Sequence, residues 1–193
     1  MNTNEGTVDL VPDATVENVA RAALLAALTG AFAYVAFPNP VSPTDITLQV
    51  LGVFLAGILL GPVWGGVSMT LYLVAGLLGA PVFLGGSSGL GAFVGPTGGY
   101  LLSYPIAAAA IGAIVHGGRA TRDPGSVGLL RLVGAMVVGT AIIYALGTVG
   151  FALAANVGLY EAFLVSAVAF IPAEALKMAA AVGVVRSDAI AAS

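Results

Sequence analysis

Residues 46–79 read ITLQVLGVFLAGILLGPVWGGVSMTLYLVAGLLG, and this stretch decides the fold. It has no charged side chain, and the uncharged sequence continues as far as Gly118, just before Arg119. A helix of ~20 apolar residues crosses the ~30 Å hydrocarbon layer of a bilayer, so the uncharged sequence is long enough for several crossings. The Gly61-Pro62 pair is a turn signal that divides residues 46–79 into two helices. The sequence therefore predicts helices packed within a membrane.

The composition of the whole chain also indicates an integral membrane protein. Of 193 residues, 59% are hydrophobic and 8% are charged, whereas soluble domains carry ~25% charged residues. The mean hydropathy is +1.05. The six basic residues and the net charge of −3 argue against nucleic-acid binding, which needs a basic surface. Because the chain has no cysteine and a single histidine, we expect no thiol chemistry, metal centre or cofactor.

The same reasoning predicts an all-α bundle of six transmembrane helices. Their approximate ranges are 15–37, 46–60, 63–79, 98–116, 128–155 and 172–187. Residues 159–171 are too few to cross the membrane and are stopped by Pro172, so we expect a re-entrant or interfacial segment there. The alternative treats that segment as a seventh element. Residues 1–14 are expected to form an acidic cytoplasmic tail, 15–187 the membrane domain and 188–193 a short cytoplasmic tail.

The arginines predict the orientation of the bundle in the membrane. With six spans they all fall on one side, which the positive-inside rule makes cytoplasmic; they are Arg21, Arg119, Arg122, Arg131 and Arg186. Both termini would then be cytoplasmic. The connections 38–45, 80–97 and 156–171 would be external. The glycine-rich residues 80–99 are able to fold back into the bundle, where protein or ligand must satisfy their amides.

Glu174 and Lys177 are the most informative residues for function. They are three positions apart and share a helix face. A charge at the centre of a membrane helix costs at least ~2.5 kcal/mol on insertion scales, so such residues normally face the bundle and mark function. The pair either binds a polar ligand or neutralises itself so that the helix is tolerated in the membrane. Lys177 is the only lysine, so the chain has no G-x-x-x-x-G-K-[ST] phosphate loop and does not hydrolyse ATP itself.

Other candidate ligand contacts lie near the predicted external loops. Thr47 and Gln49 carry hydrogen-bonding groups at the start of the second helix, although Thr47 also suits local backbone capping. Tyr100 offers a ring and a hydroxyl, or is an ordinary interfacial aromatic. Phe83 is a packing or ligand-contacting aromatic, and Gly86 and Ser87 belong to a glycine-rich loop that we expect to act as a lid.

Several motifs occur in a distinctive order. They are PTDITLQ at 43–49, LLGP at 59–62, PVF at 81–83, GPTGGYL at 95–101 and FIPAEALK at 170–177. Over about residues 15–187 this succession resembles the BioY family, the biotin-specific substrate-binding (S) components of energy-coupling-factor (ECF) transporters. The family pattern before the lysine is usually Pro-Gly-Asp. Here Ala173 and Glu174 replace Gly-Asp, which moves the carboxylate one methylene farther from the backbone.

The resemblance implies a six-helix fold, both termini in the cytoplasm, and biotin capture and uptake across the cytoplasmic membrane. Its expected partners are a transmembrane coupling subunit and two ATP-binding-cassette (ABC) ATPases. The expected substrate-binding residues are Thr47, Gln49, Phe83, Gly86, Ser87, Tyr100, Glu174 and Lys177. The expected docking face for the coupling subunit is the small-residue face of the first helix, namely Ala22, Ala26, Ala27, Gly30 and Ala31. Packing inside the protein's own bundle is the alternative for that face.

Two other classes of function remain as alternatives. The first is an S component for another vitamin or small molecule. The second is a stand-alone secondary carrier, which is disfavoured because the chain shows no clear inverted repeat. An enzyme is not expected, because there is no G-x-S-x-G motif and His116 is predicted to lie across the membrane from Ser87 and Ser88.

Overall fold

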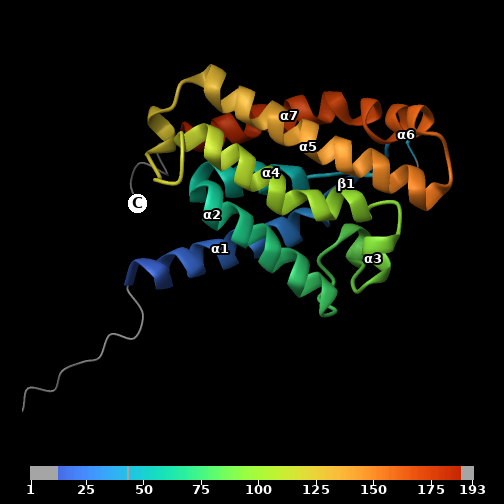
Figure 1. Ribbon diagram of the computed structural model, residues 1–193, viewed down its shortest axis with the longest axis horizontal. Coiled ribbons are helices and arrows are strands. Elements are labelled where there is room, and N and C mark those ends of the chain that lie inside the picture. The colour runs from blue at the N-terminus through green and yellow to red at the C-terminus, as the bar shows by residue number, and fades with distance from the viewer. Residues whose placement is uncertain (1–12, 43, 188–193) are drawn as a thin grey trace, which may run out of the picture.

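The computed structural model describes residues 13–42 and 44–187, and within them the chain is an elongated helical bundle (Figure 1). The predicted tails 1–12 and 188–193 lie outside the described residues. The long helices are α1 (Asp13–Phe32), α2 (Gln49–Leu77), α4 (Gly98–His116), α5 (Leu129–Ala155) and α7 (Ile171–Val185). Shorter pieces are α3 (Gly91–Val94), α6 (Leu159–Ser166) and the 3-10 turns η1 (Leu84–Gly86), η2 (Pro124–Ser126) and η3 (Val168–Phe170).

α2 reverses direction in its middle and is therefore a helical hairpin. Gly61 has φ 77° and ψ −175°, a conformation that is essentially restricted to glycine. Pro62 follows it and has no N–H to continue the helical hydrogen bonds. Gly65 lies against Ala56, because a Cβ on Gly65 would be 2.9 Å from the Ala56 carbonyl oxygen. The predicted division at Gly61-Pro62 thus exists as a reversal of the chain.

Four helical stretches among the described residues are long and apolar enough to cross a membrane. They are Gln49–Leu77, Gly98–His116, Leu129–Ala155 and Leu159–Val185. The first of them contains the reversal at Gly61. The last joins α6, η3 and α7, with a break in helical geometry at Ala167 (φ −126°, ψ −61°). The structure therefore has the membrane-spanning helical character that the composition predicts.

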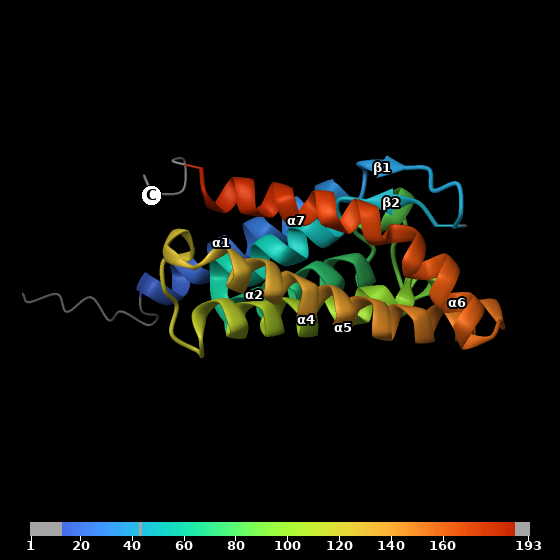
Figure 2. The ribbon, with the colours of Figure 1, turned by 90° about the horizontal axis from the view of Figure 1, so that it is seen from above.

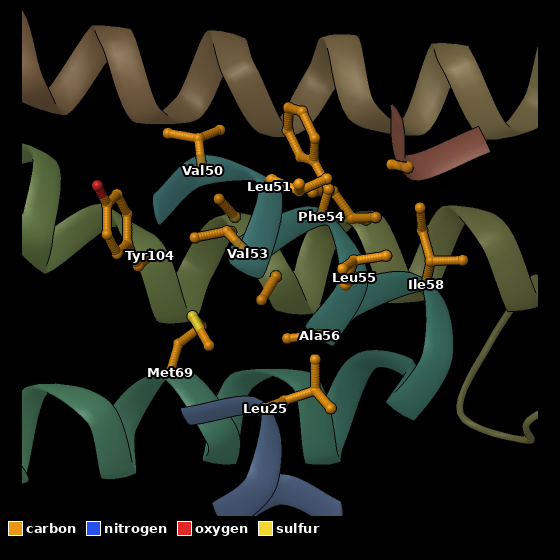
Figure 3. Packing of buried hydrophobic residues seen from close by; sticks show 14 of the residues in the cluster. Leu25, Val50, Leu51, Val53, Phe54, Leu55, Ala56, Ile58, Met69 and Tyr104 are labelled. Carbon is orange, nitrogen blue, oxygen red and sulfur yellow. The ribbon is translucent and has the colours of Figure 1, made fainter. Parts of the chain in front are cut away.

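The core lies where the two halves of α2 meet α1 and α4. Val53, Ala56 and Met69 are completely buried there, and Leu25 of α1 reaches the same cluster (Figure 3). Close helix approach depends on small residues, as is usual within membranes. Gly112 of α4, for example, lies directly against the backbone of Gly61 and Pro62.

Two predicted helix boundaries are wrong. The predicted helix 15–37 extends too far at its C-terminal end, and the predicted helix 46–60 begins too early. α1 ends at Phe32, and a two-residue antiparallel ladder joins β1 (Ala36–Phe37) to β2 (Ile46–Thr47) before α2 begins. Pro38 disfavours helix in the residue before it, and β-branched residues such as Ile46 and Thr47 suit a strand. Within 13–42 and 44–187, the fold is all-α except for this small hairpin.

The connections gather at two opposite ends of the bundle, as Figures 1 and 2 show. β1, β2, α3 and α6 lie at one end, the right-hand end in both views. The η2 loop and the end of α7 lie at the other, where Arg186 Nη2 donates to the Val127 carbonyl oxygen at 2.5 Å. His116 also lies at this second end, and its Nδ1 accepts from the Arg122 N–H at 3.0 Å.

Candidate small-molecule binding site

A cavity of about 630 Å³, its open mouth included, lies at the end of the bundle that carries β1, β2 and α3. The lining residues come from the β2–α2 region, the loop before α3, and α4, α5, α6, η3 and α7. They are Thr44, Asp45, Thr47, Gln49, Val50, Phe83, Leu84, Thr97, Tyr100, Leu101, Tyr104, Ile143, Tyr144, Ser166, Phe170, Glu174 and Lys177.

Glu174 and Lys177 form a buried ion pair in the wall of this cavity. Lys177 Nζ is 2.7 Å from Glu174 Oε1, and the two side chains are 4% and 3% exposed. Both residues lie in the first half of α7, on its inward face, whereas Leu176 on the same helix is 74% exposed. The predicted inward orientation is therefore correct. A pair this well shielded from water is costly unless other groups also satisfy its charges.

The two oxygens of the Glu174 carboxylate have different surroundings. Oε1 accepts from Lys177 Nζ at 2.7 Å and from the Tyr144 hydroxyl at 3.0 Å. Oε2 is buried and has no hydrogen-bond partner among the described residues. A buried, unpaired carboxylate oxygen is unfavourable by ~1–3 kcal/mol or more. Oε2 is therefore an acceptor available to a hydrogen-bond donor in the cavity.

Thr47 and Gln49 form a second polar group in the cavity wall. Thr47 Oγ1 donates to Gln49 Oε1 at 2.8 Å, and Gln49 Nε2 is 2.6 Å from the Tyr72 hydroxyl. That hydroxyl donates in turn to the Val82 carbonyl oxygen at 3.1 Å. Thr47 Oγ1 also accepts from the Gln49 backbone N–H at 3.4 Å, which is the local capping role considered from the sequence. Each Gln49 amide atom retains further hydrogen-bonding capacity for a ligand.

Aromatic rings supply much of the remaining wall. Phe83 is buried and meets Tyr72 edge-on, with ring centroids 5.3 Å apart. Tyr72 stacks on Tyr104 at 6.2 Å. On another part of the wall, Tyr100 meets Tyr144 edge-on at 6.0 Å, and the Tyr100 hydroxyl donates to the Ser166 carbonyl oxygen. Such offset geometries are favourable for aromatic pairs and make a rigid, largely apolar surface.

Gly86 and Ser87 do not line the cavity. Ser87 is exposed, and its hydroxyl donates to the Leu84 carbonyl oxygen at 2.8 Å. Gly86 has φ 75° and lies beside Tyr34. Of this loop, Phe83 and Leu84 reach the cavity. The structure thus shows Gly86 and Ser87 in a tight turn that directly follows the lining residues Phe83 and Leu84 in the chain, and ligand contact by Gly86 and Ser87 remains a prediction.

The small residues of α1 face in two directions. Ala22, Ala26 and Gly30 are buried, and Gly30 lies against Val82. The neighbouring Ser68 hydroxyl donates to the Ala22 carbonyl oxygen at 2.8 Å, which binds α1 to the second half of α2. This row therefore serves internal packing, the alternative considered above. Ala27 and Ala31 are exposed and are the members of the predicted docking set that a partner can reach.

Sequence reasoning missed several residues that the cavity brings together. Tyr104 follows Tyr100 by one helical turn, so the i, i+4 spacing could have placed both rings on one face. Tyr144 is a polar aromatic inside an otherwise apolar helix, which is also a usable signal. Ser166 gives no such signal, yet it lines the cavity and its Oγ is buried without a partner among the described residues. Those residues contain no group of three or more His, Cys, Asp or Glu placed to hold a metal.

The fold and the cavity define a membrane-embedded binding protein for a small molecule that has both apolar surface and hydrogen-bonding groups. Comparison with known proteins gives the family. The sequence model of the BioY family matches residues 2–192, so the chain belongs to the BioY family. This confirms the resemblance carried by the motifs.

Curated relatives and a solved structure agree with this assignment. The chain is 37% identical over 166 residues to the probable biotin transporter BioY of Pyrococcus horikoshii, which covers 86% of this chain and 92% of that protein. It is 43% identical over 146 residues to the biotin transporter BioY of Rhodobacter capsulatus, covering 74% and 73% of the two chains. The crystal structure of the S component for biotin from an ECF-type ABC transporter superposes with a TM-score of 0.81 at 25% identity, covering 92% of this chain and 93% of that one.

Proposed function

We propose that this protein captures biotin in the cavity described above and takes part in biotin uptake as the S component of an ECF-type ABC transporter in the cell membrane. The single observation that carries the ligand assignment is the buried ion pair of Glu174 and Lys177. In this pair the Oε2 atom of Glu174 has no hydrogen-bond partner among the described residues. Family membership and the likeness to the biotin S component support the same ligand.

The chemistry of biotin fits the polar groups of the wall. Its ureido ring has two N–H donors and a carbonyl acceptor, and its flexible tail ends in a carboxylate. Glu174 Oε2 accepts hydrogen bonds only, so it suits a ureido N–H and repels the tail carboxylate. The Ser166 hydroxyl and the remaining donor of Gln49 suit carbonyl or carboxylate oxygens. The aromatic walls suit the apolar faces of the bicycle.

Six membrane spans are part of the proposal. α1, the two halves of α2, α4, α5 and α7 supply them, with α6 and η3 as an interfacial or re-entrant segment before α7. The reversal at Gly61 and the hydrogen bond between Gln49 and Tyr72 support counting α2 twice. Both termini are cytoplasmic in this arrangement. The positions of three arginines support this orientation: Arg122, Arg131 and Arg186 lie at the end of the bundle opposite the cavity. The positive-inside rule makes that end cytoplasmic, so the cavity opens toward the outside, where the ligand enters.

A transmembrane coupling subunit and two ABC ATPases are the proposed partners. The chain has no phosphate-binding loop of its own, so energy for uptake comes from outside it. The exposed Ala27 and Ala31 of α1 allow a partner helix to approach closely. Replacement of both by leucine should reduce co-purification with the coupling subunit and leave biotin binding unchanged. Undiminished co-purification would remove this face from the proposal.

Binding of labelled biotin to the purified protein tests the ligand assignment. Saturable binding that excess unlabelled biotin abolishes, and that other vitamins do not, is the expected result. Displacement by another vitamin at equal or lower concentration would favour the alternative S-component function. Uptake into vesicles that contain this chain alone, driven by an ion gradient, would favour the stand-alone carrier.

A further inference from the structure

Tyr144 and Glu174 connect two helices at the cavity. The Tyr144 hydroxyl on α5 donates to Glu174 Oε1 on α7 at 3.0 Å. Within 13–42 and 44–187, this is the side-chain hydrogen bond that joins α5 directly to α7. Lys177 also donates to Oε1, at 2.7 Å and from the same helix as Glu174. Oε1 therefore has two donors that approach from different elements, and Oε2 has none among the described residues.

The ring of Tyr144 is held in place by its neighbours. The Tyr100 ring packs edge-on against it, with ring centroids 6.0 Å apart and an interplanar angle of 81°. The Phe170 ring is tilted by 42° relative to it, with ring centroids 6.4 Å apart. Tyr100 is fixed in turn, because its hydroxyl donates to the Ser166 carbonyl oxygen. Gly147, one turn beyond Tyr144, leaves the space that the Tyr100 ring fills, since a Cβ there would overlap that ring. Packing thus aims the Tyr144 hydroxyl at the carboxylate.

Two donors on one oxygen restrict the carboxylate more than one donor does. With Lys177 alone, the carboxylate could rotate about its terminal bond, where rotamers are broad and roughly two-fold. It could then turn so that both of its oxygens share the ammonium. A second donor on the neighbouring helix disfavours that rotation. Oε1 then accepts hydrogen bonds from two protein donors, and Oε2 stays available to accept a hydrogen bond from a ligand in the cavity.

We infer that Tyr144 is a positioning residue that reserves Glu174 Oε2 for an N–H donor of the ligand, and that it thereby makes the site select ligands able to donate there. The inference rests on the proposed function, because it takes biotin and its ureido ring as the ligand. It assigns no direct ligand contact to the Tyr144 hydroxyl. Its effect is transmitted through the carboxylate, so it should appear as selectivity between a donating and a non-donating ligand.

The test compares two ligands on the wild type and on Tyr144→Phe. The ligands are biotin and a biotin whose two ureido nitrogens are methylated, so that it cannot donate. The wild type should prefer biotin by at least about tenfold, because the methylated ring leaves Oε2 unpaired. Tyr144→Phe should weaken biotin binding about fivefold and hardly change binding of the methylated ligand, so the preference ratio falls. A loss confined to packing would weaken both ligands equally.

Two further variants complete the design. Tyr160→Phe removes the hydroxyl of an exposed tyrosine outside the cavity and should leave the ratio unchanged. Glu174→Gln has nearly the same shape as Glu174 but places an N–H₂ group where Oε2 was, so it should lower the ratio even if Tyr144→Phe does not fold. Tyr144→Phe leaves Oε1 with the Lys177 donor, so the variant should lose some thermal stability and still fold, and both ligands can be compared on it.

Each outcome is decisive. A wild type that does not bind biotin overturns the proposed function. A wild type that binds both ligands equally, or a Tyr144→Phe variant with the wild-type ratio, overturns this inference alone and leaves biotin binding intact. If Tyr144→Phe does not fold, Glu174→Gln decides instead. A Glu174→Gln variant that prefers biotin over the methylated ligand as strongly as the wild type does also overturns this inference.

Discussion

Gln49 and Tyr72 belong to one helical segment, 23 residues apart, yet Gln49 Nε2 lies 2.6 Å from the Tyr72 hydroxyl. In a continuous α-helix they would be about 35 Å apart at 1.5 Å per residue. The reversal at Gly61 brings them together, and both residues belong to the polar group beside the cavity. The turn at one end of the bundle therefore determines the site at the other.

Gly61→Ala should destabilise the protein by about 1–3 kcal/mol, because alanine does not tolerate φ 77° with ψ −175°. An added Cβ would also lie 2.9 Å from Thr121 Cγ2. Thermal unfolding in detergent measures the loss. Gly66→Ala is the matched control, since a Cβ there makes ordinary contacts at 3.5 and 3.6 Å and helix propensity favours alanine. Equal stability of the two variants would contradict the strain at Gly61.

Lys177→Ala should weaken biotin binding at least about tenfold, because it removes a charge-assisted donor worth ~1.5–3 kcal/mol and leaves Glu174 with one donor fewer. Equilibrium binding of labelled biotin measures the change. Unchanged affinity in a well-folded variant would refute the site. Glu174→Asp should be tolerated, because it restores the usual family residue, and a complete loss of binding would show that this pocket requires the longer side chain.

Ser166→Ala should weaken biotin binding about fivefold, since it removes a hydroxyl that a ligand can satisfy. The unliganded protein should be equally or slightly more stable, because the Ser166 Oγ is buried without a partner among the described residues. Thr148→Val is the control: its hydroxyl is similarly buried and unpaired there, but Thr148 does not line the cavity. If both variants lose the same affinity, Ser166 has no direct part in binding.

Cysteine labelling should show the orientation of the bundle. Ser87→Cys is expected to react with an impermeant thiol reagent from outside intact cells, and Ser126→Cys only after permeabilisation. Both positions are exposed. Ser87 lies between η1 and α3 and Ser126 ends η2, and α3 and the η2 loop lie at opposite ends of the bundle (Figure 1). The native chain has no cysteine, so background labelling from this protein is absent. The reverse pattern would invert the orientation and with it the direction of uptake.

Biotin should slow backbone amide exchange across Gly85 to Gly95, while Leu132 to Val138 of α5, none of which lines the cavity, hardly changes. The physical reason is that bound ligand makes one conformation of the glycine-rich loop dominant. Several loop amides are already bonded in the structure, such as the Gly89 N–H to the Gly76 carbonyl oxygen at 2.8 Å. If saturating biotin leaves exchange in the loop unchanged, these glycines are structural turns and the lid prediction is wrong.

The sequence alone determined that this chain is a membrane protein, because a surface with so few charges is not solvated by water. It also determined the reversal at Gly61-Pro62, which depends on the local backbone chemistry of two adjacent residues. The inward orientation of Glu174 and Lys177 followed from the cost of exposing charge to lipid. Thr47, Gln49, Phe83 and Tyr100 were singled out from local sequence, and the structure places all four in one cavity wall.

Only the tertiary structure decided which distant residues meet. Tyr144 and Ser166 enter the site through the packing of α5 and α6 against α4 and α7, and no spacing along the chain encodes those contacts. The two faces of α1 show the same limit: its small residues look alike in sequence, and packing against α2 buries Ala22 while Ala27 stays exposed. Even the state of Glu174 Oε2 is a tertiary property, because a carboxylate oxygen is left unpaired only by the positions of the donors around it.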